Sequence, residues 1–576
     1  MSTINKLAYL TNILIIVFEM TSSKLKITLN YVILPIISSY IIFNLGNYFL
    51  IYYSPNSHSH NIFSSVRCFG YNSSNRQCIF NQLCYHSKTN DFVFVFDANK
   101  SLIVGVPDNR FRPPLLDLSS VADHNNYYFN YIEIPSESFK QFSKTFTIET
   151  IEKPTILFAR FKPDNIMHTT HDDVLPLFHT IKKFGYDDAN IIFADEWPRH
   201  STGDLQFNDE LYRTVFRSSS IMHVKDISEN ALTCFSNLHV GLDKTTIWYD
   251  YGFFQHQHPL PKSIVETERI RRSFKEFTGQ VLSEGVKIKC DEKYTLLVSR
   301  GYTRKILNED ELITFISFKT DGKVLTVDLE SDVSFQTLAK KFHCASIIIS
   351  MHGSALIFAL FAKKGTKILE LFPYAINPEK YSPYKRLAEL QHLQYKAWAN
   401  MRKENSVQHP YDYTEELGGV SHLPIDQQIE IINTQDVPDH LCCDYPNWLF
   451  HINQDTYIDI IDFGTAFHEL LINVGDQSLF AEKIVISPGP IIDPICTRDS
   501  SNHIFRVTWQ PPWNIEYMDT PDIVYEIVIK DVYSVVSNHF SNETAFSIHS
   551  TDKCFIWIAC RANKLQGPFL TKPLIC

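Results

Sequence analysis

The chain has 576 residues, of which 44% are hydrophobic, 13% aromatic and 20% charged, and its formal net charge at pH 7 is -11. This is the composition of a globular protein long enough for three domains of ordinary size. Lys and Arg are spread along the chain without a concentrated basic stretch, which disfavours a nucleic-acid-binding protein. An anionic ligand would have to be held by a few well-placed Arg side chains or by helix N-termini.

The N-terminal part predicts a membrane anchor. Residues 27–66 contain no Asp, Glu, Lys or Arg, and residues 31–53 within them are long enough to cross a bilayer, which needs roughly 20 apolar residues. Three Lys residues and one Glu precede this run, so the positive-inside rule predicts a cytosolic N-terminus, 1–30, and a lumenal remainder that starts with a short stem, 54–67. A cleaved signal peptide is the alternative, but no convincing small-residue cleavage site follows.

Cysteines and glycosylation sequons support the lumenal topology. Three N-x-S/T triplets, at Asn72, Asn99 and Asn542, follow the predicted anchor and are candidate N-glycosylation sites. All twelve cysteines follow it too, and an oxidising lumen predicts that they form disulfides. Several of them gather in three groups: Cys68, Cys78 and Cys84; Cys442 and Cys443; and Cys554, Cys560 and Cys576. No C-x-x-C pair accompanies them, so no structural zinc site is expected.

Residues 68–258 alternate between short apolar runs and amphipathic stretches. Strands are predicted at 91–96, 155–161 and 190–197, and a helix at 172–185 that Gly185 ends. Such alternation predicts a parallel sheet flanked by helices.

Residues 259–443 repeat the pattern more regularly. Four strands and two helices are predicted: strands at 294–300, 323–330, 345–350 and 366–373, and helices at 308–318 and 354–365. Two such blocks in series predict two α/β domains that face each other across a cleft, and ligands of these folds bind at the C-terminal ends of the strands.

The pattern changes after residue 443. Residues 444–485 are less regular and are interpreted as a connecting segment. Residues 486–576 consist of strand-like runs separated by turn residues, without helical stretches. Their length, the Trp509–Trp513 region and the Y-x-I-x-I pattern from Tyr525 are similar to a fibronectin type III sandwich.

The second block carries a candidate anion site. In the turn that follows the strand at 345–350, Gly353 would expose backbone N–H groups to an anion, and His352 adds a side-chain donor. Ser299, Arg300 and Arg304 lie at another strand end, where guanidinium groups suit a pyrophosphate. Glu370, which ends a further strand, is placed to accept hydrogen bonds from a sugar or ribose hydroxyl. An ordinary turn with solvated arginines is the alternative.

The first block carries a candidate acid–base site. If a helix begins near His168, then His168 and Asp172 lie one turn apart on one face. A carboxylate there could deprotonate an acceptor hydroxyl, with His168 or Arg160 orienting it. A metal site formed by His168, His171 and Asp172 is one alternative, and acidic residues that simply favour a first helical turn, Asp172 and Asp173, are another. The spacing leaves all three open.

Several stretches resemble glycosyltransferase family 61. They are 160–181, 241–253, 296–312, 347–361 and 368–390, and the tail from residue 440 matches as well. The resemblance covers nearly everything after Cys68, and the family pattern N-x-x-H-x-x-x-D is matched by Asn165, His168 and Asp172.

The resemblance implies the fold and the reaction. The expected fold is an α/β pair of Rossmann-like domains of the GT-B type, with a C-terminal fibronectin type III β-sandwich. The N-terminal transmembrane helix is expected from the apolar run at 31–53, because the anchor region departs from the family pattern. The expected reaction is an inverting transfer of N-acetylglucosamine from UDP-GlcNAc, in β-1,4 linkage, to O-linked mannose on proteins such as α-dystroglycan. No metal or other cofactor is expected. The implied place is the endoplasmic reticulum membrane, as a single-pass type II protein, and a homodimer is compatible with it.

The resemblance also assigns residues. Arg300 and Arg304 fall where the family holds the UDP phosphates, and His352 and Gly353 fall at its donor turn. The base is expected to be Asp172, beside His168, whereas Arg160 and Asn165 lie in the acceptor-side motif. Three alternatives stay open: the same fold with another donor, such as UDP-xylose or in an O-GlcNAc transferase; a metal-dependent lumenal hydrolase; and a non-catalytic lumenal scaffold.

Overall fold

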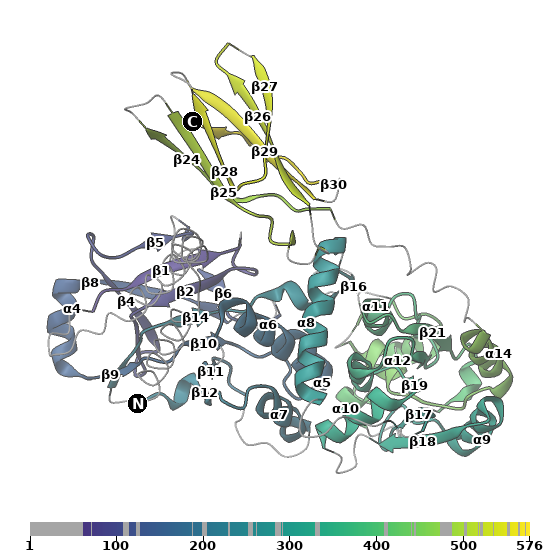
Figure 1. Cartoon of the computed structure of the whole chain (residues 1–576). Coiled ribbons are helices and arrows are strands. Elements are labelled where there is room, and N and C mark those ends of the chain that lie inside the picture. Colours follow the sequence, from purple (N-terminus) through teal and green to yellow (C-terminus); the bar gives the residue numbers. More distant parts are fainter. Residues whose placement is uncertain are drawn as a thin grey trace, which may run out of the picture. The chain divides into compact units, whose positions relative to one another are not determined.

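The structure is a computed structural model (Figure 1). It describes residues 62–576 except 71, 108–114, 122–126, 187, 198–203, 229–230, 252–256, 261, 283–289, 291, 329–333, 408–412, 439–440, 443–444, 473–486, 500–503, 516–517, 519–521, 534, 550–552, 563–564 and 571. The predicted segments 1–30 and 31–53, and most of the predicted stem, lie outside these residues. Within the described part of the chain, no helix combines the length and the apolar character needed to cross a membrane.

The first α/β part contains two mixed sheets. One has the order β12 (Ile221–His223), β11 (Asn190–Phe193), β10 (Thr155–Phe158), β14 (Leu238–Val240), β2 (Gln77–Asn81), β1 (Ser65–Phe69) and β5 (Ile103–Val104). The other has the order β8 (Tyr131–Pro135), β4 (Asp91–Phe96), β3 (Leu83–His86), β13 (Ala231–Phe235) and β9 (Thr147–Ile151). The predicted strands form, but the sheets are not purely parallel. Short connections join β1 to β2 and β3 to β4, and such connections allow only antiparallel pairing.

The second α/β part is one parallel sheet with the order β18 (Lys323–Asp328), β17 (Tyr294–Ser299), β19 (Ile347–Met351), β20 (Lys367–Phe372) and β21 (Gln394–Ala399). From β17 the chain runs through α9 (Glu309–Thr320) to β18, and then through α10 (Phe335–Cys344) to β19 on the other side of β17. The connections therefore leave β17 and β19 in opposite directions. In open α/β sheets such a switch point is where ligands bind, at the C-terminal strand ends.

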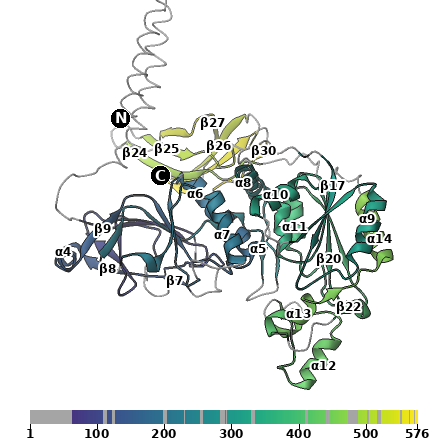
Figure 2. The ribbon, with the colours of Figure 1, turned by 90° about the horizontal axis from the view of Figure 1, so that it is seen from below.

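Helices cover both faces of this sheet. Figure 2 shows α9 and α14 (Ile460–Ile472) on one face, and α10 and α11 (Pro383–Leu390) on the other. Helix α14 and the short helix α13 (Pro446–Ile452) lie in the segment predicted to be an irregular connection. The side chains of α14 pack into the same core as the strands, with Phe463 and Phe467 buried. That segment therefore completes the second α/β part.

The predicted helix at 354–365 forms a tighter 3₁₀ helix, Ser354–Phe361. Its residues from Ala355 to Phe361 are all buried. An apolar run that is buried on every side has its winding set by core packing, because it lacks the amphipathic pattern of a surface α-helix.

The C-terminal residues form two antiparallel sheets. One has the order β24 (Ile492–Asp499), β25 (Ile504–Gln510) and β28 (Ala545–His549). The other has the order β27 (Val536–Ser541), β26 (Ile523–Asp531), β29 (Cys554–Ala562) and β30 (Leu565–Gln566), with β31 (Leu574–Ile575) also paired to β29. Their inner faces share one core, in which Trp509 of one sheet contacts Tyr525 of the other at 5.2 Å between ring centroids.

The cysteines confirm the disulfide prediction in part. Among the described residues, disulfides join Cys68 to Cys78, Cys84 to Cys234, Cys290 to Cys344, and Cys496 to Cys576, and Cys442 is disulfide-bonded as well. The expectation for Cys554 and Cys560 was wrong, because both are buried free thiols. Both lie on β29, six residues apart, which separates their Cα atoms by about 20 Å, far beyond disulfide reach. Cys443 lies outside the described residues.

The three predicted glycosylation sites are accessible. Asn72, Asn99 and Asn542 all have exposed side chains. Their modification stays a prediction.

Candidate active site

A distorted helix carries the candidate acid–base residues. The helix starts with α5 (Ile166–His168), widens into a π-helical turn (Thr169–Val174), and continues as α6 (Leu175–Phe184). The N–H of Leu175 donates to the carbonyl of Thr170, five residues back. Pro176 follows at once; it has no N–H for the carbonyl of Asp172, and its ring crowds that carbonyl, so regular α-winding is unfavourable there. Such π-turns occur frequently at functional sites.

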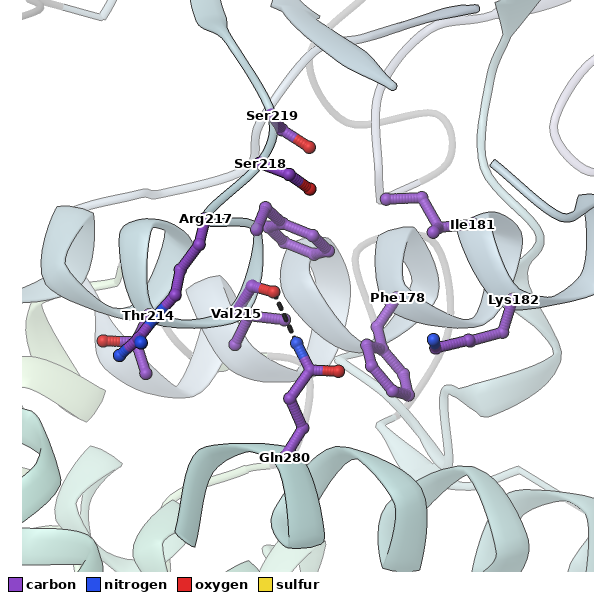
Figure 3. A pocket seen from close by; sticks show the side chains of 10 residues that line it. Phe178, Ile181, Lys182, Thr214, Val215, Arg217, Ser218, Ser219 and Gln280 are labelled. Atoms are coloured by element: carbon purple, nitrogen blue, oxygen red, sulfur yellow. Dashed lines mark hydrogen bonds between the residues drawn. The ribbon is translucent and has the colours of Figure 1, made fainter. Parts of the chain in front are cut away.

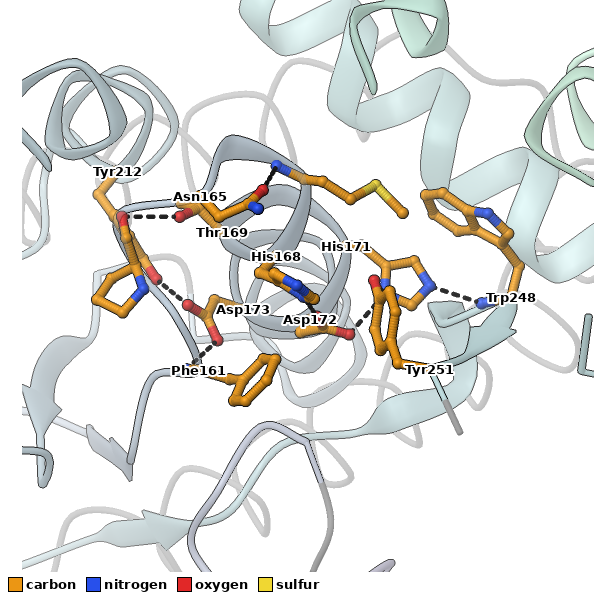
Figure 4. A network of polar contacts seen from close by, with 12 residues as sticks. Phe161, Asn165, His168, Thr169, His171, Asp172, Asp173, Tyr212, Trp248 and Tyr251 are labelled. Atoms are coloured by element: carbon orange, nitrogen blue, oxygen red, sulfur yellow. Dashed lines mark hydrogen bonds and ion pairs between the residues drawn. The ribbon is translucent and has the colours of Figure 1, made fainter. Parts of the chain in front are cut away.

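Asp172 is the centre of a buried network (Figure 4). Its side chain is 3% exposed; His168 Nδ1 lies 2.8 Å from Oδ2 and His171 Nδ1 lies 2.5 Å from Oδ1. The Nε2 atom of His171 accepts the backbone N–H of Trp248 at 3.1 Å. The proton of His171 must therefore sit on Nδ1, where it is donated to Asp172. The Tyr251 hydroxyl also donates to Asp172 and lies 2.9 Å from His171 Nδ1.

These contacts keep Asp172 ionised. Burial raises the pKa of Asp172, but the interactions with His171 and His168 outweigh burial and lower the pKa to about 2. An anionic Asp172 accepts from His168 Nδ1–H, which leaves a lone pair on His168 Nε2. The imidazole ring lies between Phe161 and Tyr251, at centroid distances of 4.7 and 4.6 Å. With Nδ1 bonded to Asp172, the Nε2 atom of His168 is therefore the nitrogen that can face a substrate.

Asp173 faces the other way. Its Oδ1 accepts the N–H of Phe161 at 3.3 Å and its Oδ2 contacts the Tyr212 hydroxyl at 3.1 Å (Figure 4). The side chain is fully buried, and this burial raises the pKa of Asp173 well above its ordinary value. Asp173 belongs to the packing between the helix and the neighbouring elements.

The two residues predicted on the acceptor side both make hydrogen bonds to other groups of the protein. Arg160 is 2% exposed; its Nη2 lies 2.8 Å from Asp195 Oδ1, and its guanidinium stacks on Phe193 at 4.2 Å. Asn165 caps α5, because its side chain accepts the N–H of Met167. Asp195 was not predicted, although it follows β11 as Arg160 follows the neighbouring strand β10.

The residues of the predicted anion site come together at the switch point of the second sheet. Arg300 and Arg304 follow β17, and His352 and Gly353 follow β19. Arg304 Nη1 donates to the carbonyl of His352 at 2.9 Å. A Cβ atom on Gly353 would lie only 2.8 Å from Arg304 Nη1 and 2.9 Å from Arg300 Nη1. Both guanidinium groups therefore lie so close to this turn that a side chain larger than that of glycine would clash with them.

Among the described residues, Arg304 has no ion-pair partner. Burial, and then the charge of Arg300, lower the pKa of Arg304 well below its ordinary value. Within the described part of the chain, the Nε atom of Arg304 has no hydrogen-bond partner either. The backbone of Arg304 has a φ of 57° and its N–H donates to the carbonyl of Asn453. A half-buried cation with a strained backbone, held in this way, suits an anionic ligand.

Glu370 and Ser299 are bonded to protein partners. Glu370 is fully buried; its Oε1 accepts from His352 Nδ1 at 2.6 Å and its Oε2 from the Tyr395 hydroxyl at 2.5 Å. Glu370 therefore fixes the orientation of His352. Ser299 Oγ donates to Glu309 Oε2 at 2.8 Å.

Aromatic residues connect the two candidate sites. Trp248 Nε1 donates to the carbonyl of Pro383 at 3.1 Å, and the Tyr249 hydroxyl accepts the N–H of Ser382 at 3.4 Å. Tyr251 contacts the His168 ring at 4.6 Å between ring centroids. Sequence reasoning did not single out these residues, although the stretch 248–251 is rich in aromatic side chains.

Within the described residues, no group of three or more His, Cys, Asp or Glu side chains is arranged to hold a metal ion. That no metal is needed stays a prediction. A cavity of about 390 Å³ lies between later turns of α6, the end of α7 (Asp204–Val215) and α8 (Ile264–Leu282) (Figure 3). Its lining includes Lys182, Arg217 and Gln280 and none of the predicted site residues.

Comparisons with known proteins agree with the resemblance. The family model for Glycosyltransferase 61 matches residues 166–369, which include His168, Asp172, both arginines and the Gly353 turn. The protein O-linked-mannose beta-1,4-N-acetylglucosaminyltransferase 2 of Takifugu rubripes is 35% identical over 534 residues, covering 87% of each chain. The proteins of that name from Mus musculus and Homo sapiens are each 34% identical over 525 residues, covering 88% of each chain.

Proposed function

We propose, from the premise that the chain belongs to glycosyltransferase family 61, that it transfers N-acetylglucosamine from UDP-GlcNAc to O-linked mannose in β-1,4 linkage. The observation that carries the proposal is the arginine pair. Arg300 and Arg304 close on the Gly353 turn at the switch point of a parallel sheet. Two guanidinium groups there suit the diphosphate of a nucleotide sugar. The choice of N-acetylglucosamine as the sugar and of O-linked mannose as the acceptor follows the names of the similar proteins.

The base in this proposal is His168. The C4 hydroxyl of mannose attacks the anomeric carbon from the face opposite UDP and gives its proton to His168 Nε2. The bond between the anomeric carbon and the β-phosphate oxygen breaks, and its electron pair stays on UDP. Asp172 was predicted as the base, but both of its oxygens accept from imidazoles and its pKa is about 2, which makes it a poor proton acceptor near neutral pH. Asp172 instead accepts a hydrogen bond from His168 Nδ1–H and so keeps the proton of His168 on Nδ1.

The remaining predictions extend the proposal. The two α/β parts would be a GT-B pair, with bounds near 68–258 and 259–443, and residues 486–576 would be a fibronectin type III domain. The sheet order, and the two antiparallel sheets around Trp509 and Tyr525, support this. The exposed sequons and the disulfides of the described residues support a lumenal enzyme of the endoplasmic reticulum, held by the anchor at 31–53. An α-dystroglycan-like acceptor and a homodimer complete the proposal.

Gly353→Ala is expected to weaken UDP binding by about 10-fold or more, since a lost charge-assisted contact costs about 1.5–3 kcal/mol. Gly353 has a φ of 155°, and an added Cβ would push both guanidinium groups out of place. Titration calorimetry with UDP measures the effect. Gly365→Ala is the control, because Gly365 also has a positive φ but nothing lies within 4 Å of its added Cβ. Equal affinity in the two variants would contradict the arginine cluster as the UDP site.

The test of the function is a transfer assay with the full-length chain. An O-mannosylated peptide is incubated with UDP-GlcNAc or with UDP-xylose, with and without a chelator, and the product linkage is determined by NMR. We expect chelator-resistant transfer of N-acetylglucosamine in β-1,4 linkage. Transfer from UDP-xylose alone would show that the donor is not UDP-GlcNAc. Loss of transfer in the presence of chelator would contradict a metal-free mechanism. A folded protein that transfers neither sugar would favour the non-catalytic scaffold.

A further inference from the structure

The side chain of Tyr384 is buried beside the arginine pair, and its hydroxyl makes no hydrogen bond to the described groups around it. The residue is 3% exposed, and among the residues that the structure describes its hydroxyl has no hydrogen-bond partner. Its ring lies against His352 at 5.7 Å between centroids. The charges of Glu370, Arg304 and Arg300 all act on the hydroxyl. The phenol O–H therefore has its donor capacity available for a ligand that binds beside the arginine pair.

The protein fixes this side chain from two directions. Tyr384 lies in the first turn of α11, directly after Pro383. The carbonyl of Pro383 accepts from Trp248 Nε1, and the N–H of Ser382 donates to the Tyr249 hydroxyl, so residues of the first α/β part hold the start of α11. The same stretch, 248–251, carries Tyr251, which donates to Asp172. Tyr384 therefore lies between the arginine pair and the network of His168.

We infer that the Tyr384 hydroxyl donates a hydrogen bond to the β-phosphate of the bound nucleotide sugar, which rests on the proposed function. The bond that breaks joins the β-phosphate oxygen to the anomeric carbon, and that carbon must face His168. Of the two phosphates, the β-phosphate is therefore the one on the side of His168, where Tyr384 lies. The hydroxyl stabilises the charge that develops on the leaving oxygen and does not transfer its proton.

The protonation of Tyr384 agrees with this role. Burial, and then the charge of Glu370, raise the pKa of Tyr384 well above its ordinary value, although Arg304 and Arg300 oppose them. The phenol therefore stays a hydrogen-bond donor throughout the physiological pH range. A neutral donor adds a hydrogen bond to those of the two guanidinium groups without adding a third positive charge.

The experiment compares nucleotide binding by wild type and Tyr384→Phe, which removes only the hydroxyl. Calorimetry on the full-length chain measures the affinities for UDP and for UMP. We expect UDP to bind about 10-fold more weakly to Tyr384→Phe, as for the loss of one charge-assisted hydrogen bond, and UMP to bind equally well to both. With UDP-GlcNAc and an O-mannosylated peptide, kcat is expected to fall by about 10-fold or more, whereas the KM for the peptide stays the same.

Tyr381→Phe is the matched control. Tyr381 is equally buried, three residues earlier, and its hydroxyl lies 3.5 Å from the carbonyl of Val437. A similar loss of UDP affinity in Tyr381→Phe would show a packing effect of the segment and overturn the inference. An equal loss for UDP and UMP would overturn the choice of the β-phosphate, and unchanged UDP binding would overturn the contact itself. A folded wild type that binds no UDP would instead refute the proposed function, and the inference with it.

Discussion

Replacing His168 with Ala is expected to lower kcat by about 10²–10⁴-fold, the range of a lost general base, with UDP affinity unchanged. The physical reason is that His168 Nε2 is the free basic atom of the network, because Nδ1 is committed to Asp172 at 2.8 Å. Transfer rates with UDP-GlcNAc and an O-mannosylated peptide, together with calorimetry for UDP, measure the two effects. Added imidazole is expected to restore part of the activity, because the side chain leaves a space of that shape.

Two neighbouring carboxylates serve as comparisons. Asp172→Asn is expected to lose activity on the same scale, because an amide cannot accept from both imidazoles, so that His168 is released from its productive tautomer. Asp173→Asn is expected to stay within about 3-fold of wild type, since an amide can still accept from Phe161 and bond to Tyr212. Imidazole rescue of His168→Ala but not of Asp172→Asn would support His168 as the base. Full activity of His168→Ala would return that role to Asp172.

The sequence was sufficient to predict the parts of the site that follow strand ends. Arg300, Arg304, His352 and Gly353 each follow an apolar run, and parallel strands bring their C-terminal ends to one edge of the sheet. The role of Glu370 was not predictable in the same way. Which side chains occupy its two oxygens, His352 and Tyr395, depends on side-chain orientation across three neighbouring strands, which the residue pattern does not encode.

The π-turn and the aromatic bridge differ in how much the sequence reveals. Pro176 in the predicted helix is a local signal for irregular winding, and it could have been used to place the π-turn before it. Trp248, Tyr251 and Tyr384 carry no such signal, because large aromatic residues are most often core residues. Their roles depend on contacts between segments more than 130 residues apart, such as that of Trp248 with Pro383.

Replacing Arg304 with Gln is expected to weaken UDP binding by about 10–100-fold, as for the loss of a hydrogen bond between charged partners. The variant is nevertheless expected to keep or gain thermal stability without ligand. Burial and the neighbouring Arg300 disfavour the charged guanidinium, since both lower its pKa, so a neutral side chain relieves a cost of the folded state. Gln also keeps a donor for the carbonyl of His352, which Arg304 now contacts at 2.9 Å.

Thermal unfolding with and without UDP separates the two effects. Wild type is expected to unfold at a higher temperature when UDP is present, because a ligand that binds only the folded state stabilises it, and Arg304→Gln is expected to lose most of this increase. Arg272→Gln is the control, because Arg272 is exposed on α8 and pairs with Glu276 one turn away. A large fall in the unliganded unfolding temperature of Arg304→Gln would mean that Arg304 holds the fold together. A stable variant that no longer responds to UDP would mean that the half-buried charge of Arg304 is kept for the diphosphate, at a cost to stability that the ligand offsets.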